Sequence, residues 1–295
     1  MGIRIVTDST SEISQAEAAK LGIDVVPLRT LFGDVAYRDG IEITPADFYA
    51  RLAASKVLPT TSQPAPADFL EIYRQARKAG DEVVTICLAR LLSGTCQSAE
   101  LAREACGDDG IWIVDSNTAT VSLQLLVRLA ISLRDSQVPA AGIVEALERE
   151  KSRVHLLAAI DTLEYLHRGG RLSRASAVTG TLLNVKPLIS LAEGTISVVG
   201  KSLGRNKAHA AVLKLVQALG GIDYGRPFAI GYTGSRGHFG AFEERCRRFF
   251  KETDKGGGTA DIDGGAQEPI VTQVGSVVGT HAGPGAVAIA FFSKS

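Results

Sequence analysis

Residues 82–115 read EVVTICLARLLSGTCQSAELAREACGDDGIWIVD, and this stretch decides the fold. A run rich in β-branched residues at 82–88 is followed by a Ser-Gly-Thr loop, a helical pattern over about 96–105 and a second such run at 111–115. Short apolar runs that alternate with helices of this length are typical of α/β proteins with a parallel sheet. We therefore predict an α/β fold with a largely parallel sheet around this stretch.

The same alternation continues on both sides of residues 82–115. An N-cap followed by proline at the first helical position favours a helix that begins at Thr44-Pro45, and Pro66 opens another that ends at Gly80. The other predicted elements are strands at 3–7 and 23–26, a short helix near 11–21, and two helices between 119 and 151. These elements predict an N-terminal α/β domain over residues 1–154.

From about residue 155 the pattern changes to longer strand candidates, which predict a C-terminal α+β domain over 155–295 with a mixed sheet. Its first feature is a hairpin that turns at Glu193-Gly194-Thr195. A glycine-rich stretch at 255–266 lacks the spacing of a phosphate loop and is interpreted as a flexible surface loop. The other predicted elements are strands at 187–192, 196–199, 228–232, 270–274 and 286–292, and helices at 206–219 and 238–250.

The composition excludes several classes of function. The 295 residues carry 32 Lys+Arg and 32 Asp+Glu, so there is no general electrostatic reason to bind nucleic acid or an anionic membrane. Apolar runs fall far short of a membrane-spanning helix, so we expect no integral membrane insertion. The first residues show neither a secretion signal nor a myristoylation pattern, and we expect a cytoplasmic protein.

Metal and nucleotide sites are not indicated either. The four cysteines form no CxxC pair, and the five histidines are scattered singly, which argues against a metal enzyme or a disulfide framework. Neither a dinucleotide fingerprint nor a phosphate loop is present. We therefore expect no metal and no cofactor.

Four loops rich in hydroxyl groups remain as candidates: 7–11, 60–64, 93–95 and 115–118. Neutral hydroxyls and free backbone N–H groups suit a carboxylate or phosphate, because they donate hydrogen bonds without a counter-charge. Each loop taken alone is better explained as a helix N-cap. Their repetition after successive strands favours a binding site, because ligands of open α/β sheets bind at the carboxyl ends of the strands.

Two other segments concentrate polar side chains near glycines. His281 lies among three glycines at 279–285, which favours a loop rather than a helix face and presents the imidazole at a crevice. Arg168 and Arg171 flank Gly169-Gly170 just before a predicted helix, an arrangement suited to an anion. A structural histidine and a solvated surface turn are equally good explanations of these two patterns.

At these residues the sequence resembles the DegV family, whose members are the fatty-acid-binding subunits of bacterial fatty acid kinases. The resemblance extends over nearly the whole chain, as one two-domain unit. It is carried by six motifs in order: Thr7-Asp8-Ser9-Thr10, Thr61-Ser62-Gln63-Pro64, Leu92-Ser93-Gly94-Thr95 with Gln97-Ser98-Ala99, Leu163-Glu164-Tyr165-Leu166 leading into Gly169-Gly170-Arg171-Leu172-Ser173, Asn184-Val185-Lys186-Pro187, and Gly279-Thr280-His281-Ala282-Gly283-Pro284-Gly285.

The resemblance implies that a long-chain fatty acid such as palmitate lies in an apolar tunnel at the domain junction. Its carboxylate would be bound by Thr61 and Ser93, with His281 close by in the network. Secondary contacts with an anion or phosphate would come from Arg171, Ser62 and Gly94. The protein would not be a catalyst: it would present the fatty acid to a separate ATP-dependent kinase subunit, and the acyl phosphate would enter phospholipid synthesis.

One departure from the family pattern concerns the predicted partner. The family often carries a basic residue just before the glycine that follows the second hairpin strand, whereas Leu203 precedes Gly204 here. If that basic residue engages the kinase subunit, docking is absent or has moved to Arg205.

An enzymatic alternative is a lipid-ester hydrolase with Ser93 as nucleophile and His281 as base. A nucleophile elbow would show Gly-x-Ser-x-Gly, and Leu92-Ser93-Gly94-Thr95 lacks the first glycine. The strained turn that exposes a catalytic serine is therefore not signalled, and the carrier function is favoured.

Overall fold

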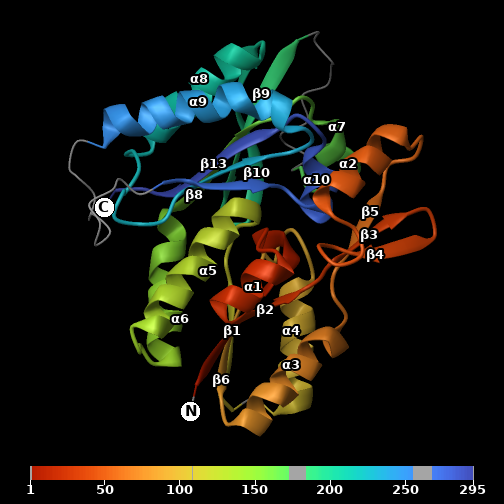
Figure 1. The fold of residues 1–295 in the computed structure, drawn as a ribbon, viewed down its shortest axis with the longest axis vertical. Coiled ribbons are helices and arrows are strands. Elements are labelled where there is room, and N and C mark those ends of the chain that lie inside the picture. Colours follow the sequence, from red (N-terminus) through yellow and green to blue (C-terminus); the bar gives the residue numbers. More distant parts are fainter. Residues whose placement is uncertain (1, 108, 173–183, 255–267, 295) are drawn as a thin grey trace.

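Two sheets of different construction form the two halves of the protein (Figure 1). The computed structural model describes residues 2–107, 109–172, 184–254 and 268–294. The glycine-rich segment at 255–266 and Ser173 lie outside the described residues.

The first sheet is parallel throughout, which confirms the predicted parallel arrangement, and its strand order is β2-β1-β6-β7. Helices α3 and α4 cover one face, and α5 and α6 pack against the other, so the strands are buried on both sides. Its elements are β1 (Ile3–Asp8), β2 (Ile23–Val26), β6 (Glu82–Cys87), β7 (Ile111–Asp115), α1 (Gln15–Leu21), α3 (Pro66–Ala79), α4 (Thr95–Cys106), α5 (Thr120–Asp135) and α6 (Ala140–Glu150).

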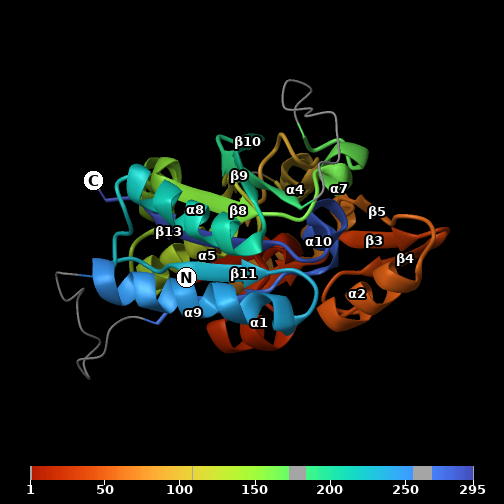
Figure 2. The same ribbon diagram turned by 90° about the horizontal axis from the view of Figure 1, so that it is seen from above.

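The second sheet is mixed and has the order β10-β9-β8-β13-β11-β12, which confirms the predicted C-terminal α+β architecture. Only β11 and β12 pair in parallel among its described strands. Helices α8 and α9 cover its outer face (Figures 1 and 2). Its elements are β8 (Val154–Ala159), β9 (Val185–Ala192), β10 (Thr195–Leu203), β11 (Ala229–Tyr232), β12 (Ile270–Gln273), β13 (Val287–Phe292), α8 (Arg205–Ala218) and α9 (Arg236–Thr253).

Helix α5 lies between the two sheets. It contacts β1 and β6 of the first sheet and β8, β11 and β13 of the second. Because both sides of the helix face a sheet, residues around its whole circumference are buried, including Val121, Leu123 and Leu126. The inner faces of the two sheets and α5 therefore share one apolar core.

A small third sheet, which the sequence did not predict, has the order β4-β3-β5. Beside it lie α2 and α10, with α7 next to α10 (Figure 2). A capping box between Thr44 and Asp47 starts α2 at the predicted position. The elements are β3 (Arg29–Phe32), β4 (Val35–Arg38), β5 (Thr60–Ser62), α2 (Pro45–Ala54), α7 (Glu164–Arg168) and α10 (Ser276–Ala282).

Candidate functional site

An apolar cavity of about 210 Å³ lies between the inner face of the second sheet and the carboxyl ends of the first. Five adjacent strands, from β10 to β11, contribute to one wall, and at about 4.8 Å between neighbouring strands this wall spans roughly 19 Å. The opposite wall comes from the loops after β1, β2, β6 and β7 and from α10. The wall residues on the second sheet include Ile196, Leu191, Ile189, Leu156, Ala158, Ala288 and Gly231.

Polar side chains converge on this cavity from three separate parts of the chain. Thr61 Oγ1 lies 2.9 Å from His281 Nε2, although 220 residues separate them in sequence. Ser93 Oγ lies 2.9 Å from Thr95 Oγ1, and the neighbouring Gly94 contacts the Gln63 side chain closely. Thr61, Gln63, Ser93, Gly94 and His281 all line the cavity. The structure therefore brings three of the predicted motifs together.

Arg171 also lines the cavity, but its guanidinium already bonds to the protein backbone. Its Nε donates to the Leu92 carbonyl at 3.1 Å, and its Nη1 donates to the Gly169 carbonyl at 2.6 Å. Arg168, the second arginine of that motif, pairs instead with Glu164 at 2.8 Å on the surface. Arg171 thus connects the Ser93 loop to the segment after α7.

His281 corrects an expectation from the sequence, because it lies on helix α10 and not in a loop. Two of the three glycines that suggested a loop have other roles: an added Cβ at Gly279 would come within 2.7 Å of Phe48 and Tyr49, and Gly283, with φ of 69°, ends the helix. The helix is short, and its sequence contains one glycine and two β-branched valines, so no local propensity signals it.

The environment of His281 keeps its imidazole neutral at physiological pH. Burial and the charge of Arg171 lower the pKa of His281 to about 4. Its Nδ1 is buried without a hydrogen-bond partner among the described residues, and a Cβ at Gly169 would lie 2.1 Å from it. The cavity lining therefore includes a neutral imidazole bonded to a neutral hydroxyl, with one guanidinium nearby.

Ser62, which was predicted as a secondary anion contact, lies outside the cavity lining and is exposed. Successive side chains of a strand point to opposite faces, so the register that turns Thr61 and Gln63 inward turns Ser62 outward. Gly94 does line the cavity.

The candidate nucleophile and base of the hydrolase alternative are not paired with each other. The hydroxyl of Ser93 bonds to Thr95, and the imidazole of His281 bonds to Thr61. A serine nucleophile needs its base within hydrogen-bond reach. The arrangement therefore gives the hydrolase alternative no support.

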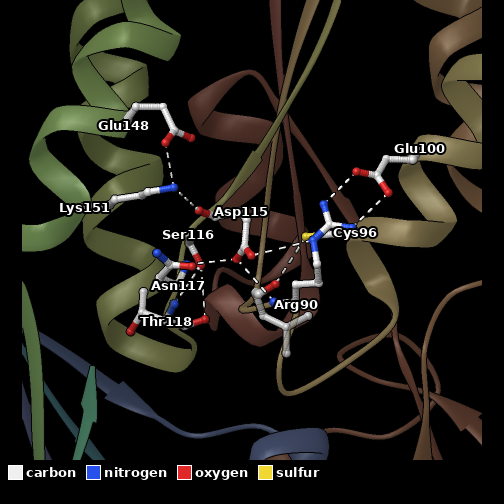
Figure 3. Close-up of polar contacts among 10 residues, drawn as sticks. Arg90, Cys96, Glu100, Asp115, Ser116, Asn117, Thr118, Glu148 and Lys151 are labelled. Carbon is white, nitrogen blue, oxygen red and sulfur yellow. Dashed lines mark hydrogen bonds and ion pairs between the residues drawn. The ribbon is translucent and has the colours of Figure 1, made fainter. Parts of the chain in front are cut away.

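Two of the predicted hydroxyl loops are occupied by bonds within the protein. Figure 3 shows the loop after β7, where Asp115 accepts from the backbone of Arg90 and Asn117, and Lys151 donates to the Asp115 carbonyl. After β1, Asp8 accepts from Thr10 and from the Leu88 backbone. These two carboxylates hold neighbouring loops together. Asp8 also caps the short helix at Ser9–Ser11, whereas α5 begins after Ala119 without a side-chain cap.

Sequence reasoning missed a pair of buried carboxyl groups, Glu12 and Asp39, near the amino end of α10. Asp39 accepts from the backbone and the hydroxyl of Ser276, and also bonds with Ser9 and the Val277 backbone. Glu12 bonds with Gly275 and Thr120. Among the described residues no ion pair reaches either carboxyl. Contacts between segments far apart in the sequence bury Glu12 and Asp39 beside α10, so the local sequence could not reveal this pair.

Burial and the charge of Asp39 raise the pKa of Glu12 well above its usual 4.5. The folded state therefore favours protonated Glu12, and this contribution to stability is present below pH 4.5 and is lost as the pH rises through the folded pKa. We expect Glu12→Gln, which has nearly the same shape as the protonated acid, to be more stable than the parent at pH 8, by about 2–4 °C in Tm. Near pH 4 the parent and Glu12→Gln should have the same Tm. A Tm difference as large at pH 4 as at pH 8 would contradict the raised pKa of Glu12.

Within the described ranges, histidine, cysteine and carboxylate side chains form no group of three that would hold a metal ion. In the same ranges, every helix is too short or too polar to cross a bilayer.

The fold and the site define a class: an α/β protein whose two large sheets both contribute to an apolar cavity with a cluster of polar side chains in its lining. A family model described as "Uncharacterised protein, DegV family" matches residues 2–294, and the chain therefore belongs to the DegV family. A DegV domain-containing protein of Deinococcus radiodurans is 36% identical over 291 residues, with 98% of each chain covered.

Two solved structures are similar over the full length of both chains. One is a DegV family protein from Thermus thermophilus, studied for fatty acid binding, with 32% identity and a TM-score of 0.86. The other is DegV of Bacillus subtilis, described as a fatty acid binding protein, with 29% identity and a TM-score of 0.80.

Proposed function

We propose that this protein is a non-catalytic carrier of a long-chain fatty acid such as palmitate, which it presents to a separate ATP-dependent kinase subunit in the cytoplasm. Thr61, Ser93 and His281 bind the carboxylate, and Arg171 and Gly94 contact the phosphate that is later added. The observation that carries this proposal is an apolar cavity with neutral hydroxyls in its lining. We assign the carboxylate site to the junction of two domains, 1–154 and 155–295.

The dimensions of the cavity suit an acyl chain of about sixteen carbons. An extended chain advances about 1.3 Å per carbon–carbon bond, so palmitate is roughly 19 Å long. This equals the extent of the five strands that contribute to the wall. At about 0.8 kcal/mol per methylene, burial of the chain gives a gross driving force on the order of 12 kcal/mol.

The carboxylate end depends on how one proton is shared between Thr61 and His281. Neutral His281 carries a single N–H, and its Nδ1 has no partner among the described residues. A buried N–H without an acceptor is rarer than a buried acceptor without a donor, so we assign the proton to Nε2. That Nε2–H donates to Thr61 Oγ1, which leaves the hydroxyl hydrogen of Thr61 free for the ligand carboxylate.

We expect Thr61→Ala and Ser93→Ala each to weaken palmitate binding by roughly tenfold to a hundredfold, because each removes one charge-assisted hydrogen bond while the buried chain keeps its driving force. Calorimetric titration of delipidated protein measures the effect. Ser62→Ala is the matched control, since this neighbouring hydroxyl faces solvent, and it should bind as the parent does. Normal binding by both site variants would move the carboxylate elsewhere.

For Arg171→Ala we expect a smaller loss of palmitate binding than of acyl phosphate formation with a cognate kinase subunit. Its guanidinium makes backbone bonds in the ligand-free protein, and a planar cation becomes most important when phosphate charge develops. Acyl phosphate is measured by trapping with hydroxylamine. Loss of palmitate binding itself in Arg171→Ala would make this arginine the primary anion contact.

The residues at the end of β10 bear on the kinase partner. Leu203 is exposed and ends the strand, and Gly204, with φ of 78°, precedes α8. Arg205, which is one of the two alternatives considered for docking, pairs with Asp161 at 2.6 Å. A partner that uses Arg205 must therefore compete with Asp161, or contact both.

A further inference from the structure

Helix α10 is attached at both ends to one pair of strands. At its carboxyl end, His281 Nε2 lies 2.9 Å from Thr61 Oγ1 on β5. At its amino end, the Ser276 hydroxyl lies 2.8 Å from the Thr30 hydroxyl on β3. Thr30 and Thr61 are directly paired in the β3–β5 register. The two contacts, the strand pair and the helix therefore form a closed ring.

The amino end of α10 is fixed by several hydrogen bonds to Ser276. One oxygen of Asp39 accepts from the Ser276 backbone at 2.9 Å and from the Ser276 hydroxyl at 2.6 Å. The Ser276 hydroxyl has a single hydrogen, which it gives to Asp39, so the Thr30 hydroxyl donates to Ser276. Asp39 is 4% exposed and Ser276 and Thr30 are completely buried, so water does not compete for these bonds.

A helix of seven residues is not stable by itself and takes its position from its contacts. Gly275 allows the carboxylates to approach, since a Cβ there would lie 3.1 Å from Glu12 and 3.2 Å from Asp39. The cavity lining contributed by α10 includes Val277, Val278 and His281. A shift at the amino end of the helix therefore displaces the imidazole at its carboxyl end.

We propose that Asp39 is a positioning residue for the carboxylate site: through Ser276 it fixes α10 on β3 and thereby holds the His281 imidazole on Thr61. The role in ligand binding rests on the proposed fatty acid function, whereas the positioning of His281 is a property of the ligand-free protein.

The first test is therefore made without ligand, by nitrogen NMR of the imidazoles, with the His281 signals assigned from their loss in His281→Gln. In the parent we expect one fixed tautomer with the proton on Nε2. In Asp39→Asn we expect the His281 shifts to move toward the average of a free imidazole, because both Ser276 bonds go to one carboxylate oxygen and a neutral amide oxygen accepts them more weakly. Unchanged His281 shifts in a folded Asp39→Asn protein would overturn the proposal.

A gentler pair of variants covers the case in which Asp39→Asn does not fold. Thr30→Val removes only the hydroxyl that donates to Ser276, and valine is well tolerated in a strand. Thr30→Ser retains that hydroxyl. We expect the His281 shifts to change in Thr30→Val and to keep their parental values in Thr30→Ser. Equal shifts in the two variants would show that the bond between Thr30 and Ser276 does not position His281.

The second test measures palmitate affinity in a double-mutant cycle. Asp39→Asn alone should weaken binding by roughly tenfold. If Asp39 acts through His281 and Thr61, the double variant of Asp39→Asn and Thr61→Ala should lose less palmitate affinity than the product of the two single losses. The matched control is Asp39→Asn with Ser93→Ala, where the effects should multiply because Ser93 bonds to Thr95 outside the ring. Multiplication in both cycles would assign Asp39 a merely structural role.

The two proposals can fail separately. If the parent protein binds no fatty acid, the proposed function is wrong, and the NMR result alone decides whether Asp39 positions His281.

Discussion

Ala288→Phe is expected to weaken palmitate binding by roughly a thousandfold while the fold is retained. Ala288 lies on β13 in the cavity wall, with Ala158 and Gly231 as its partners on the adjacent strands. Because both neighbours are small, a benzyl group has room to enter the cavity and excludes part of the acyl chain. Exclusion of about five methylenes costs about 4 kcal/mol, which is roughly a thousandfold in affinity.

Calorimetric titration of delipidated protein measures the loss, and thermal unfolding shows whether the variant is folded. Ala288→Val serves as the graded control and should weaken palmitate binding by a smaller factor, since it adds only two methyl groups. Parental affinity for palmitate in a folded Ala288→Phe protein would show that the acyl chain does not lie against β13.

Gly169→Ala is expected to weaken palmitate binding by about a hundredfold. The backbone of Gly169 is in an ordinary helical conformation, so alanine causes no strain there. Its Cβ, however, would lie 2.1 Å from His281 Nδ1 and 3.1 Å from the Tyr165 carbonyl. The imidazole must move away and lose its bond with Thr61, so two groups of the carboxylate site are disturbed together.

Gly170→Ala is the matched control for this substitution. Gly170 has φ of 70° and no atom within 4 Å of an added Cβ. Alanine there lowers stability by about 1–2 kcal/mol through backbone strain but does not reach the imidazole. We therefore expect Gly170→Ala to melt earlier and to bind palmitate normally. Equal losses of affinity in both variants would attribute the effect to the turn rather than to His281.

The parts of the fold that could be predicted from the sequence are those with strong local signals. Thr44 with Pro45 starts α2, and Gly80, with φ of 74°, ends α3. Both large sheets follow from β-branched runs of four to eight residues, and the predicted parallel and mixed arrangements are confirmed. The hairpin is also confirmed, although its strands extend further than predicted, to Val185 at one end and Leu203 at the other.

The parts that could not be predicted depend on contacts between distant segments. The strands of the third sheet have only three or four residues each, and α10 is stabilised by carboxylates more than 200 residues away. Local propensity contains no information about such contacts, so His281 was expected in a loop. The position of Ser62 has a similar cause, because only the pairing of β5 with β3 decides which hydroxyls face inward.

The residues of the candidate site illustrate the same division. Thr61, Ser93, Arg171 and His281 were named from motifs, and all four line the cavity. Their geometry, in which the imidazole bonds to Thr61 and not to Ser93, required the structure. The positioning group Asp39 lies in no motif and was found only through its bonds to Ser276.

The most direct test of the central claim is organic extraction of the purified protein followed by mass spectrometry of the extract. Burial of a sixteen-carbon chain is strong enough for a ligand to survive purification. We predict close to one long-chain fatty acid per protein molecule, and markedly less in Ala288→Phe prepared in parallel. A stoichiometric nucleotide or sugar in place of lipid would contradict the assignment of the cavity to a fatty acid.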